Sequence, residues 1–360
     1  MSALPSRLGL DIDLGRPGKQ RGFIVLPHSV HRSAYGIIRM PIACIANGSG
    51  PTVLLTAGIH GDEYEGQIAI ARLAQQLDPA EVSGRVIMLQ AVNIAAALNG
   101  TRLSPIDDRD LNRCFPGDPR GTFSYMLAHF LDGVVLPHAD ISVDVHSAGH
   151  SFDSALSTNM HSVPDLEVRR RTLAAASAFG APYNVVFWSV DEGATFTSCV
   201  ERRGLISLGT ELGGWGRVSV EGVRIAERGI RNVLKHFGVL QGAPETVQRD
   251  GSPGTRHMMV RDQSYFSFAP ANGLFEPRHL AGQDVAAGEI AGFLHFIEDI
   301  DRPRVIPESL HRRAGVAHRF AARGGRDRAR HRGERYAERG ARQRRSHQYA
   351  HRHREEAAGR

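Results

Sequence analysis

The sequence is poor in cysteine and in long apolar runs, and both shortages narrow the class of protein. Three of its 360 residues are cysteines, Cys44, Cys114 and Cys199, and they stand far apart. This spacing excludes a disulfide framework and a CxxC metal site. There is no run of about 18 apolar residues, and Asp11 and Asp13 stand where a secretory signal needs an apolar core. We therefore expect a cytoplasmic protein without membrane contact.

Basic charge is scarce in most of the chain. The formal net charge is +6, but residues 311–360 contain 16 Arg, no Lys and 5 acidic residues, a balance of +11. The remaining residues, with 28 basic and 33 acidic side chains, therefore carry −5. The positive charge thus belongs to one segment, and we expect no nucleic-acid partner. A binding protein that holds nucleic acid through this tail is the alternative from another class.

The basic tail, residues 302–360, is rich in Arg and His and has almost no aliphatic residue larger than Ala after residue 311. Such a composition predicts disorder. Basic RNA-binding arms and His-rich metal chelators are alternatives for the tail. It is also the composition that a GC-rich gene gives when read out of frame. Our hypothesis is a frameshift between Arg302 and Pro307, which fails if neither other frame of the source DNA encodes an apolar, strand-patterned continuation.

Apolar strand-like runs alternate with helix-like patterns through the rest of the chain. We expect strands at residues 22–26, 35–42, 52–57, 85–92, 141–145, 183–187 and 205–208, and helices at 66–77, 122–135, 164–179 and 218–237. This alternation predicts an α/β fold with a mixed, mostly parallel sheet flanked by helices. Shorter strands expected at 257–260 and 290–296 predict a small C-terminal β-rich domain. We place the catalytic α/β domain at 1–240 and the appended β-rich domain at 241–301.

Polar residues follow three of the expected strands. His60 and Glu63 follow the run at 52–57, and His146 follows the run at 141–145. In parallel sheets, ligand sites lie at the carboxyl ends of the strands. Two histidines and one glutamate with an open fourth position form a catalytic zinc set, so we expect one zinc ion per subunit. Glu211 follows the run at 205–208 between glycines, where it can act as the base of metal-assisted hydrolysis.

The segment from residue 93 to residue 117 is long and polar, as loops that bind ligands often are. Arg113 can hold a substrate carboxylate with two parallel hydrogen bonds, and Arg102 can stabilise an oxyanion. Arg113 as a structural residue tied to Asp110 stays open as an alternative.

Several motifs together resemble the succinylglutamate desuccinylase/aspartoacylase family of zinc carboxypeptidase-like amidohydrolases. The resemblance covers roughly residues 20–300. Its motifs are GIHGDEYEG, which contains His60 and Glu63, the spacing from residue 93 to Arg102, DLNR at 110–113, DVHS at 144–147 and TELGG at 210–214.

The resemblance implies zinc on His60, Glu63 and His146, with Glu211 as general base. It further implies that Arg102 polarises the scissile carbonyl, that Asn112 and Arg113 hold the substrate's carboxylate, and that the protein is a homodimer. The implied partner is a small N-acyl amino acid.

Within the family, the SPID, NRCFPG and AFGAPY segments look most like the branch that deacetylates N-α-acetyl-L-2,4-diaminobutyrate in ectoine breakdown. The alternatives in chemistry are a desuccinylase or aspartoacylase acting on other N-acyl amino acids and a zinc carboxypeptidase acting on peptides. The longer loop between Arg102 and Asn112 sets this chain apart from aspartoacylase.

Less specific interpretations apply to single residues. A lone His60 or His146 is more often a hydrogen-bonded structural residue than a metal ligand. Asp144 is either a partner that orients a ligand or a strand-end hydrogen-bond acceptor. Cys114 beside Arg113 could be taken for a nucleophile, but we expect a small packing residue.

Overall fold

The computed structural model describes residues 6–188, 193–249, 252–286 and 288–306. Among these, residues 6–267 and 279–289 form one compact unit, and residues 268–278 and 290–306 form a second. The expected disorder and frameshift of the tail fall almost entirely on residues outside the described ones. Within the described ranges, no helix has the length and apolar character needed to cross a membrane.

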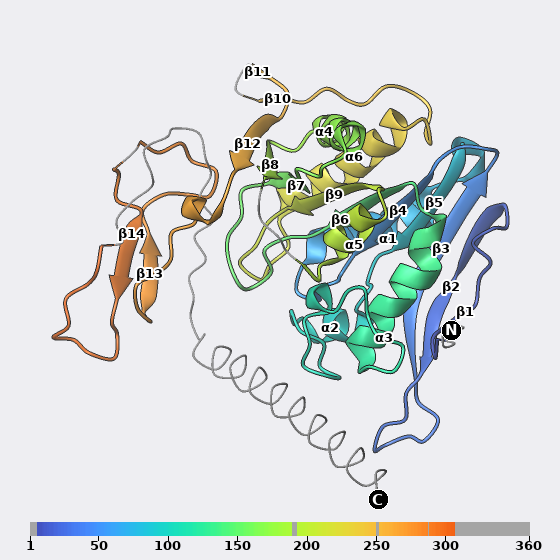
Figure 1. The fold of residues 1–360 in the computed structure, drawn as a ribbon, viewed down its shortest axis with the longest axis horizontal. Coiled ribbons are helices and arrows are strands. Elements are labelled where there is room, and N and C mark those ends of the chain that lie inside the picture. The colour runs from blue at the N-terminus through green and yellow to red at the C-terminus, as the bar shows by residue number, and fades with distance from the viewer. Residues whose placement is uncertain (1–5, 189–192, 250–251, 287, 307–360) are drawn as a thin grey trace, which may run out of the picture. The chain divides into compact units, whose positions relative to one another are not determined.

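A ten-stranded sheet forms the centre of the larger unit, in the order β1-β2-β3-β5-β4-β6-β9-β7-β8-β12 (Figure 1). The strands are β1 (Gly9–Leu10), β2 (Gly18–Pro27), β3 (Ile37–Asn47), β4 (Thr52–Ala57), β5 (Gly84–Leu89), β6 (Ile141–Val145), β7 (Ser157–His161), β8 (Tyr183–Phe187), β9 (Ile206–Glu211) and β12 (Arg256–Val260). Five neighbouring pairs are parallel and four are antiparallel. The predicted mixed, mostly parallel α/β sheet is confirmed.

Helices cover both faces of this sheet (Figure 1). One face is packed by α1 (Tyr64–Gln76), α4 (Leu166–Phe179) and α6 (Val220–His236), and the other by α3 (Phe123–Phe130) and α5 (Phe196–Arg202). Each face has its own hydrophobic core: the first core contains residues of α1, α4 and α6, and the second contains residues of α3 and α5. Along β4, Val53 and Leu55 point into the first core and Leu54 points into the second. Because successive side chains of a strand alternate between faces, burial on both sides explains the continuous apolar run.

The remaining elements are short. They are α2 (Ile94–Asn99), 3₁₀ turns at Pro79–Glu81, Leu111–Arg113, Leu136–His138 and Gln263–Tyr265, a π-helical turn at Leu131–Val135, and the antiparallel strand pair β10 (Gln248–Arg249) and β11 (Ser252–Pro253). The smaller unit contains one antiparallel pair, β13 (Leu274–Pro277) and β14 (Gly292–His295). The domain boundary at residue 240 remains a proposal. Strand β12 follows this boundary in sequence, but it pairs in parallel with β8 in the large sheet.

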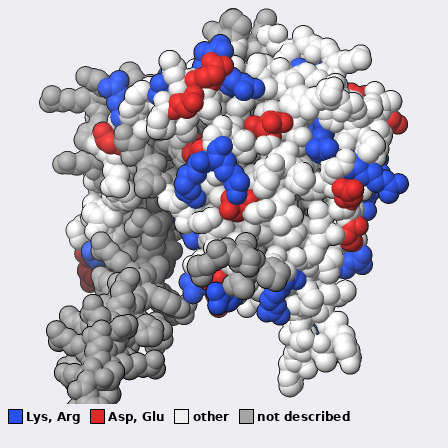
Figure 2. All heavy atoms as spheres, turned by 45° about the vertical axis from the view of Figure 1, so that its right-hand side comes forward, with Lys and Arg blue, Asp and Glu red and all other residues white. Residues whose placement is uncertain are grey.

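The described surface mixes charges of both signs. In Figure 2, Lys and Arg side chains lie among Asp and Glu side chains over the same face of the larger unit. That face therefore has no continuous basic surface among the residues that the structure describes.

A glycine in α6 lets this helix pack closely against α4. Gly229 of α6 lies against Phe179 of α4, and a Cβ on Gly229 would lie 2.4 Å from the phenyl ring. Phe179 is fully buried in the first core, so its ring has no room to move away.

We expect Gly229→Ala to lower the free energy of unfolding. Overpacking costs about 1–3 kcal/mol, which outweighs the gain in helix propensity of about 1 kcal/mol. Gly133→Ala is the matched control, because nothing lies within 4 Å of a Cβ placed at Gly133. Urea unfolding followed by circular dichroism measures both variants, and equal stability of the two would contradict the packing argument.

Candidate functional site

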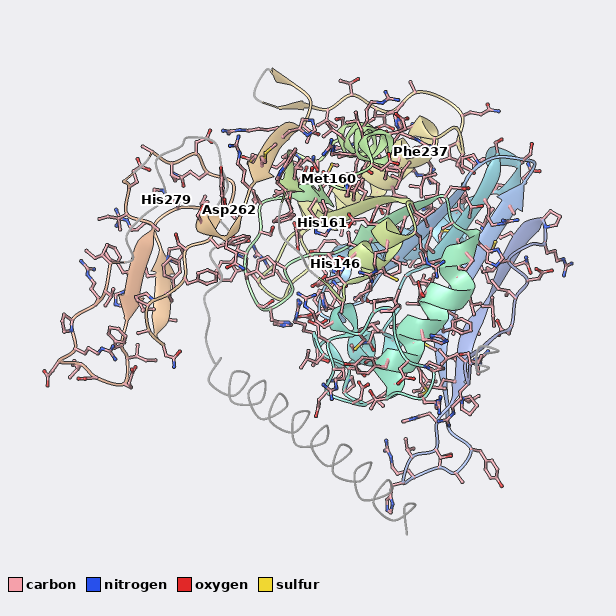
Figure 3. All side chains as sticks on the ribbon, in the orientation of Figure 1. His146, Met160, His161, Phe237, Asp262 and His279 are labelled. Atoms are coloured by element: carbon pink, nitrogen blue, oxygen red, sulfur yellow. The ribbon has the colours of Figure 1, made fainter. Side chains whose placement is uncertain are left out.

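Three neighbouring parallel strands end at the same edge of the sheet. β4 pairs with β6, and β6 pairs with β9, each in parallel. His60 and Glu63 follow β4, His146 follows β6 (labelled in Figure 3), and Glu211 is the last residue of β9. The topology therefore brings together the four residues that the sequence separates by up to 151 positions.

Glu63 lies between the two histidines. Its Oε1 is 2.7 Å from His60 Nδ1, and its Oε2 is 2.7 Å from His146 Nδ1. One ligand atom from each residue lies within 4.8 Å of the other two, and the three side chains are 3–12% exposed. Two imidazole nitrogens and a carboxylate converging in this way fit a zinc ion.

The close approach of α1 to β6 makes this convergence possible. Glu63 is the N-cap residue of α1, and Gly66 lies in the first turn of that helix. A Cβ on Gly66 would lie 2.7 Å from the Val145 side chain, so only glycine lets the helix start this close to the end of β6. Ser147, which follows His146, donates its backbone N–H to Glu63 Oε2 at 3.1 Å.

The electrostatics of the three residues favour positive charge at their centre. Burial lowers the pKa of each histidine, but the carboxylates of Glu63, Asp110 and Asp144 outweigh it and raise both above their ordinary values. Burial also raises the pKa of Glu63, and the two histidines reverse this, so the pKa of its carboxyl is well below its usual range. A bound divalent cation would supply the positive charge that the ionised carboxylate requires.

Two further carboxylates hold the outer nitrogens of the histidines. His146 Nε2 is 2.7 Å from Asp144 Oδ2, and Asp144 Oδ1 accepts a hydrogen bond from the Thr56 hydroxyl at 2.7 Å. His60 Nε2 is 3.0 Å from Asp110 Oδ1. Each contact directs the other ring nitrogen, Nδ1, toward Glu63, as outer partners of metal-binding histidines do.

Asp110 was not among the predicted site residues. Burial raises the pKa of Asp110, but the His60 hydrogen bond and the charges of His60 and Arg102 bring it well below its usual range. One signal for it is present in the sequence, a carboxylate that begins the DLNR motif. It did not indicate which residue that carboxylate would contact.

Arg102 connects the three residues to a cleft. Its Nη1 is 3.5 Å from Glu63 Oε1 and 3.4 Å from His60 Nδ1, and its Nη2 donates to Asp110 Oδ2 at 3.2 Å. The side chain is 32% exposed. It also lines an open cleft of about 660 Å³, together with residues 62, 99–101, 103–105, 108, 150 and 151. A substrate in this cleft can therefore reach the guanidinium.

Asn112 and Arg113 lie in the 3₁₀ turn that follows Asp110. The side-chain oxygen of Asn112 accepts a hydrogen bond from the backbone N–H of Phe196 at 2.8 Å, which ties the loop to the start of α5. Arg113 is exposed, and its Nη1 donates to the backbone oxygen of Asn112 at 2.7 Å. The guanidinium that binds Asp110 is that of Arg102. A carboxylate-binding role for Asn112 and Arg113 stays a prediction.

The residues on either side of Glu211 contact the backbone of His146. The residue before it, Thr210, donates its hydroxyl to the His146 backbone oxygen at 2.9 Å, and the residue after it, Leu212, donates its N–H to the same oxygen at 3.1 Å. These two contacts hold the chain around Glu211 against the end of β6. Its role as general base stays a prediction.

Cys114 is a packing residue in this structure. It is buried in the second core, and its thiol donates to the backbone oxygen of Asp110 at 3.3 Å. Burial, with the charges of Asp107 and Asp110, raises the pKa of the thiol to about 12. The thiol is therefore neutral near pH 7 and is a poor nucleophile.

We expect Asp144→Asn to weaken zinc binding about 10- to 100-fold, because the histidine loses the carboxylate that orients it. Asp140→Asn is the matched control. Asp140 precedes the same strand and accepts a hydrogen bond from the Thr52 N–H at 2.7 Å, away from the histidines. Competition with a chromophoric chelator measures both affinities. Equal zinc affinity of the two variants would show that Asp144 does not position His146.

Known proteins resemble this chain over most of its length. The catalytic domain described as Succinylglutamate desuccinylase/Aspartoacylase matches residues 49–237. The N-alpha-acetyl-L-2,4-diaminobutyric acid deacetylase of Halomonas elongata is 38% identical over 321 residues, which are 88% of this chain and 92% of the relative.

Two solved structures share both sequence and fold. The succinylglutamatedesuccinylase/aspartoacylase of Rhodobacter sphaeroides is 62% identical with a TM-score of 0.84, over 89% of this chain and 95% of that one. The product-bound ectoine utilization protein EutE (DoeB) of Ruegeria pomeroyi is 37% identical with a TM-score of 0.81, over 87% and 93%. These findings confirm the resemblance found in the sequence: the chain belongs to the succinylglutamate desuccinylase/aspartoacylase family and is an amidohydrolase.

Proposed function

We propose that this amidohydrolase removes the acetyl group from N-α-acetyl-L-2,4-diaminobutyrate and depends on zinc. The observation that carries the proposal is the convergence of His60, Glu63 and His146 beside Arg102 at the wall of a cleft. Its volume of about 660 Å³ falls within the range of roughly 300–1,000 Å³ typical of small-molecule sites. The substrate is the one in the name of the Halomonas elongata relative.

His60, Glu63 and His146 would hold the zinc ion. When bound, zinc supplies a Lewis acid that polarises the scissile carbonyl and increases the acidity of water. The residues around it have separate tasks. Asp110 and Asp144 keep Nδ1 of each histidine directed at the shared carboxylate. Arg113 and the amide of Asn112 bind the carboxylate of the substrate.

Glu211 would move the proton during hydrolysis. Its carboxylate accepts a proton from water as the water oxygen adds to the acetyl carbon. Arg102 stabilises the negative charge that develops on the carbonyl oxygen. Glu211 then returns the proton to the amide nitrogen, the carbon–nitrogen bond breaks, and acetate and 2,4-diaminobutyrate leave.

A second class of candidate substrates follows from the Rhodobacter sphaeroides protein, which is named as a succinylglutamate desuccinylase/aspartoacylase and is 62% identical to this chain. Succinylglutamate and N-acetylaspartate carry an acidic side chain, whereas N-α-acetyl-diaminobutyrate carries a cationic one. Turnover of these compounds by the same preparation distinguishes the candidates directly.

We expect the zinc-loaded protein to release acetate from N-α-acetyl-L-2,4-diaminobutyrate and to leave succinylglutamate, N-acetylaspartate and a C-terminal peptide unchanged. Glu211→Gln should lower kcat about 10²- to 10⁴-fold, since the proton loses its acceptor, and should keep zinc bound. Glu221→Gln, at an exposed position of α6, is the matched control. Acetate release by coupled assay and zinc content by mass spectrometry give both readouts.

Preferred turnover of succinylglutamate or N-acetylaspartate would replace the proposed substrate. Full activity of Glu211→Gln would remove Glu211 from the reaction. Hydrolysis that persists after complete removal of zinc would contradict the metal dependence.

A further inference from the structure

We infer that Asp62 binds the side-chain ammonium of the substrate and so determines specificity for a diamino acid. The inference rests on the proposed function and adds a recognition site to it. Asp62 lies between His60 and Glu63 in sequence, but its carboxylate is not one of the three groups that converge on a cation.

Asp62 is buried at the wall of the substrate cleft. Its side chain is only 4% exposed, yet the residue lines the same cleft of about 660 Å³ as Arg102. Arg102, which lines this cleft together with Asp62, also contacts Glu63 and His60, so the cleft adjoins these two residues through Arg102.

The two oxygens of the Asp62 carboxylate differ in their bonding. Oδ2 accepts hydrogen bonds from the His150 backbone N–H at 2.9 Å and from His150 Nδ1 at 3.1 Å. Oδ1 is buried and has no hydrogen-bond partner among the residues that the structure describes. A buried acceptor without a partner is unfavourable, so this atom calls for an explanation such as a bound ligand, ion or water, or a functional role.

A primary ammonium would satisfy this oxygen. It carries three N–H donors, and its hydrogen bonds to carboxylates are the stronger, charge-assisted kind. His150 bonds only Oδ2, and its side chain is 58% exposed, so Oδ1 is the oxygen left for a ligand. The cationic end of 2,4-diaminobutyrate supplies such an ammonium, and the acidic substrates of the second candidate do not.

The charges along the cleft agree with this assignment. Its lining contains one guanidinium, Arg102, and two carboxylates, Asp62 and Asp108. Arg102 lies on the side of the hydrolytic residues, where its Nη2 is already paired with Asp110. Asp108 is exposed to solvent, which weakens its attraction for a cation, whereas Asp62 is shielded from water. The geometry therefore favours Asp62 over Asp108.

The test compares two substrates that differ only in the ammonium, N-α-acetyl-L-2,4-diaminobutyrate and N-α-acetyl-L-2-aminobutyrate. We expect Asp62→Asn to lower kcat/KM for the diamino compound about 10- to 100-fold, mainly through KM, because a charge-assisted hydrogen bond is lost. The neutral compound should keep its kcat/KM within about threefold. This ratio is insensitive to general damage at the site, since damage lowers both values together.

Asp108→Asn separates the two carboxylates. Loss of the preference in Asp108→Asn, with the preference kept in Asp62→Asn, would overturn the inference. If Asp62→Asn fails to fold, Asp62→Ser removes the charge with a smaller side chain and is judged by the same ratio.

A binding measurement distinguishes this inference from the proposed function. Calorimetric titration with L-2,4-diaminobutyrate and L-2-aminobutyrate needs no turnover. Tighter binding of the diamino acid by the natural protein, lost in Asp62→Asn, would support the role of Asp62 even if hydrolysis of the acetyl compound is absent. Equal binding of the two amino acids by the natural protein would overturn it. Absence of acetate release alone contradicts the proposed function and not the role of Asp62.

Discussion

The carboxylate of Glu63, shared between His60 and His146, is the interaction on which the rest of the site depends. A buried carboxylate is costly unless it is paired and hydrogen-bonded. Here both oxygens are paired with imidazoles at 2.7 Å, and Oε2 accepts a backbone N–H as well. These contacts require α1 to begin directly against the end of β6. Gly66 permits that approach, and the parallel pairing of β4 with β6 sets its position.

The sheet topology places further residues next to these three. Because β4, β6 and β9 are parallel neighbours, His60, Glu63, His146 and Glu211 lie at one edge of the sheet, at the carboxyl ends of these strands. The polar loop between β5 and β6 then closes around them. It contributes Asp110 to His60, Arg102 to Glu63 and to the cleft, and Asn112 to the start of α5. The residues proposed for hydrolysis and the cleft proposed for the substrate thus adjoin each other at one edge.

Strands and helices with a strong hydrophobic pattern of their own could be predicted from the sequence. Residues 52–57 and 141–145 are mostly apolar because both faces of their strands are buried, and they agree with β4 and β6. In contrast, β7 was missed because its sequence, STNMH, is largely polar, and only pairing with β8 and β9 makes it a strand. Likewise α5 has seven residues, too few for a helical period to stand out.

The same distinction holds for the site. His60 and His146 could be predicted because they lie shortly after recognisable strands, and Glu63 because it stands three residues after His60. Asp110 could not, since its contact with His60 spans 50 residues of sequence and depends on how the loop folds back. For the same reason the sequence suggested only the neighbouring Arg113 as a partner for Asp110, whereas Arg102 makes this contact in the structure. The inference about Asp62 depends on a difference between its two oxygens, of which one is bonded to His150 and the other is not hydrogen-bonded by any described residue, and the sequence does not show this difference.

The most direct test of this account is anomalous X-ray diffraction at the zinc absorption edge, from crystals of the zinc-loaded protein. If zinc binds as proposed, we expect one peak per chain, within coordination distance of Nδ1 of His60, Nδ1 of His146 and the Glu63 carboxylate. A peak bound by other residues, or no peak at this position at saturating zinc, would contradict it.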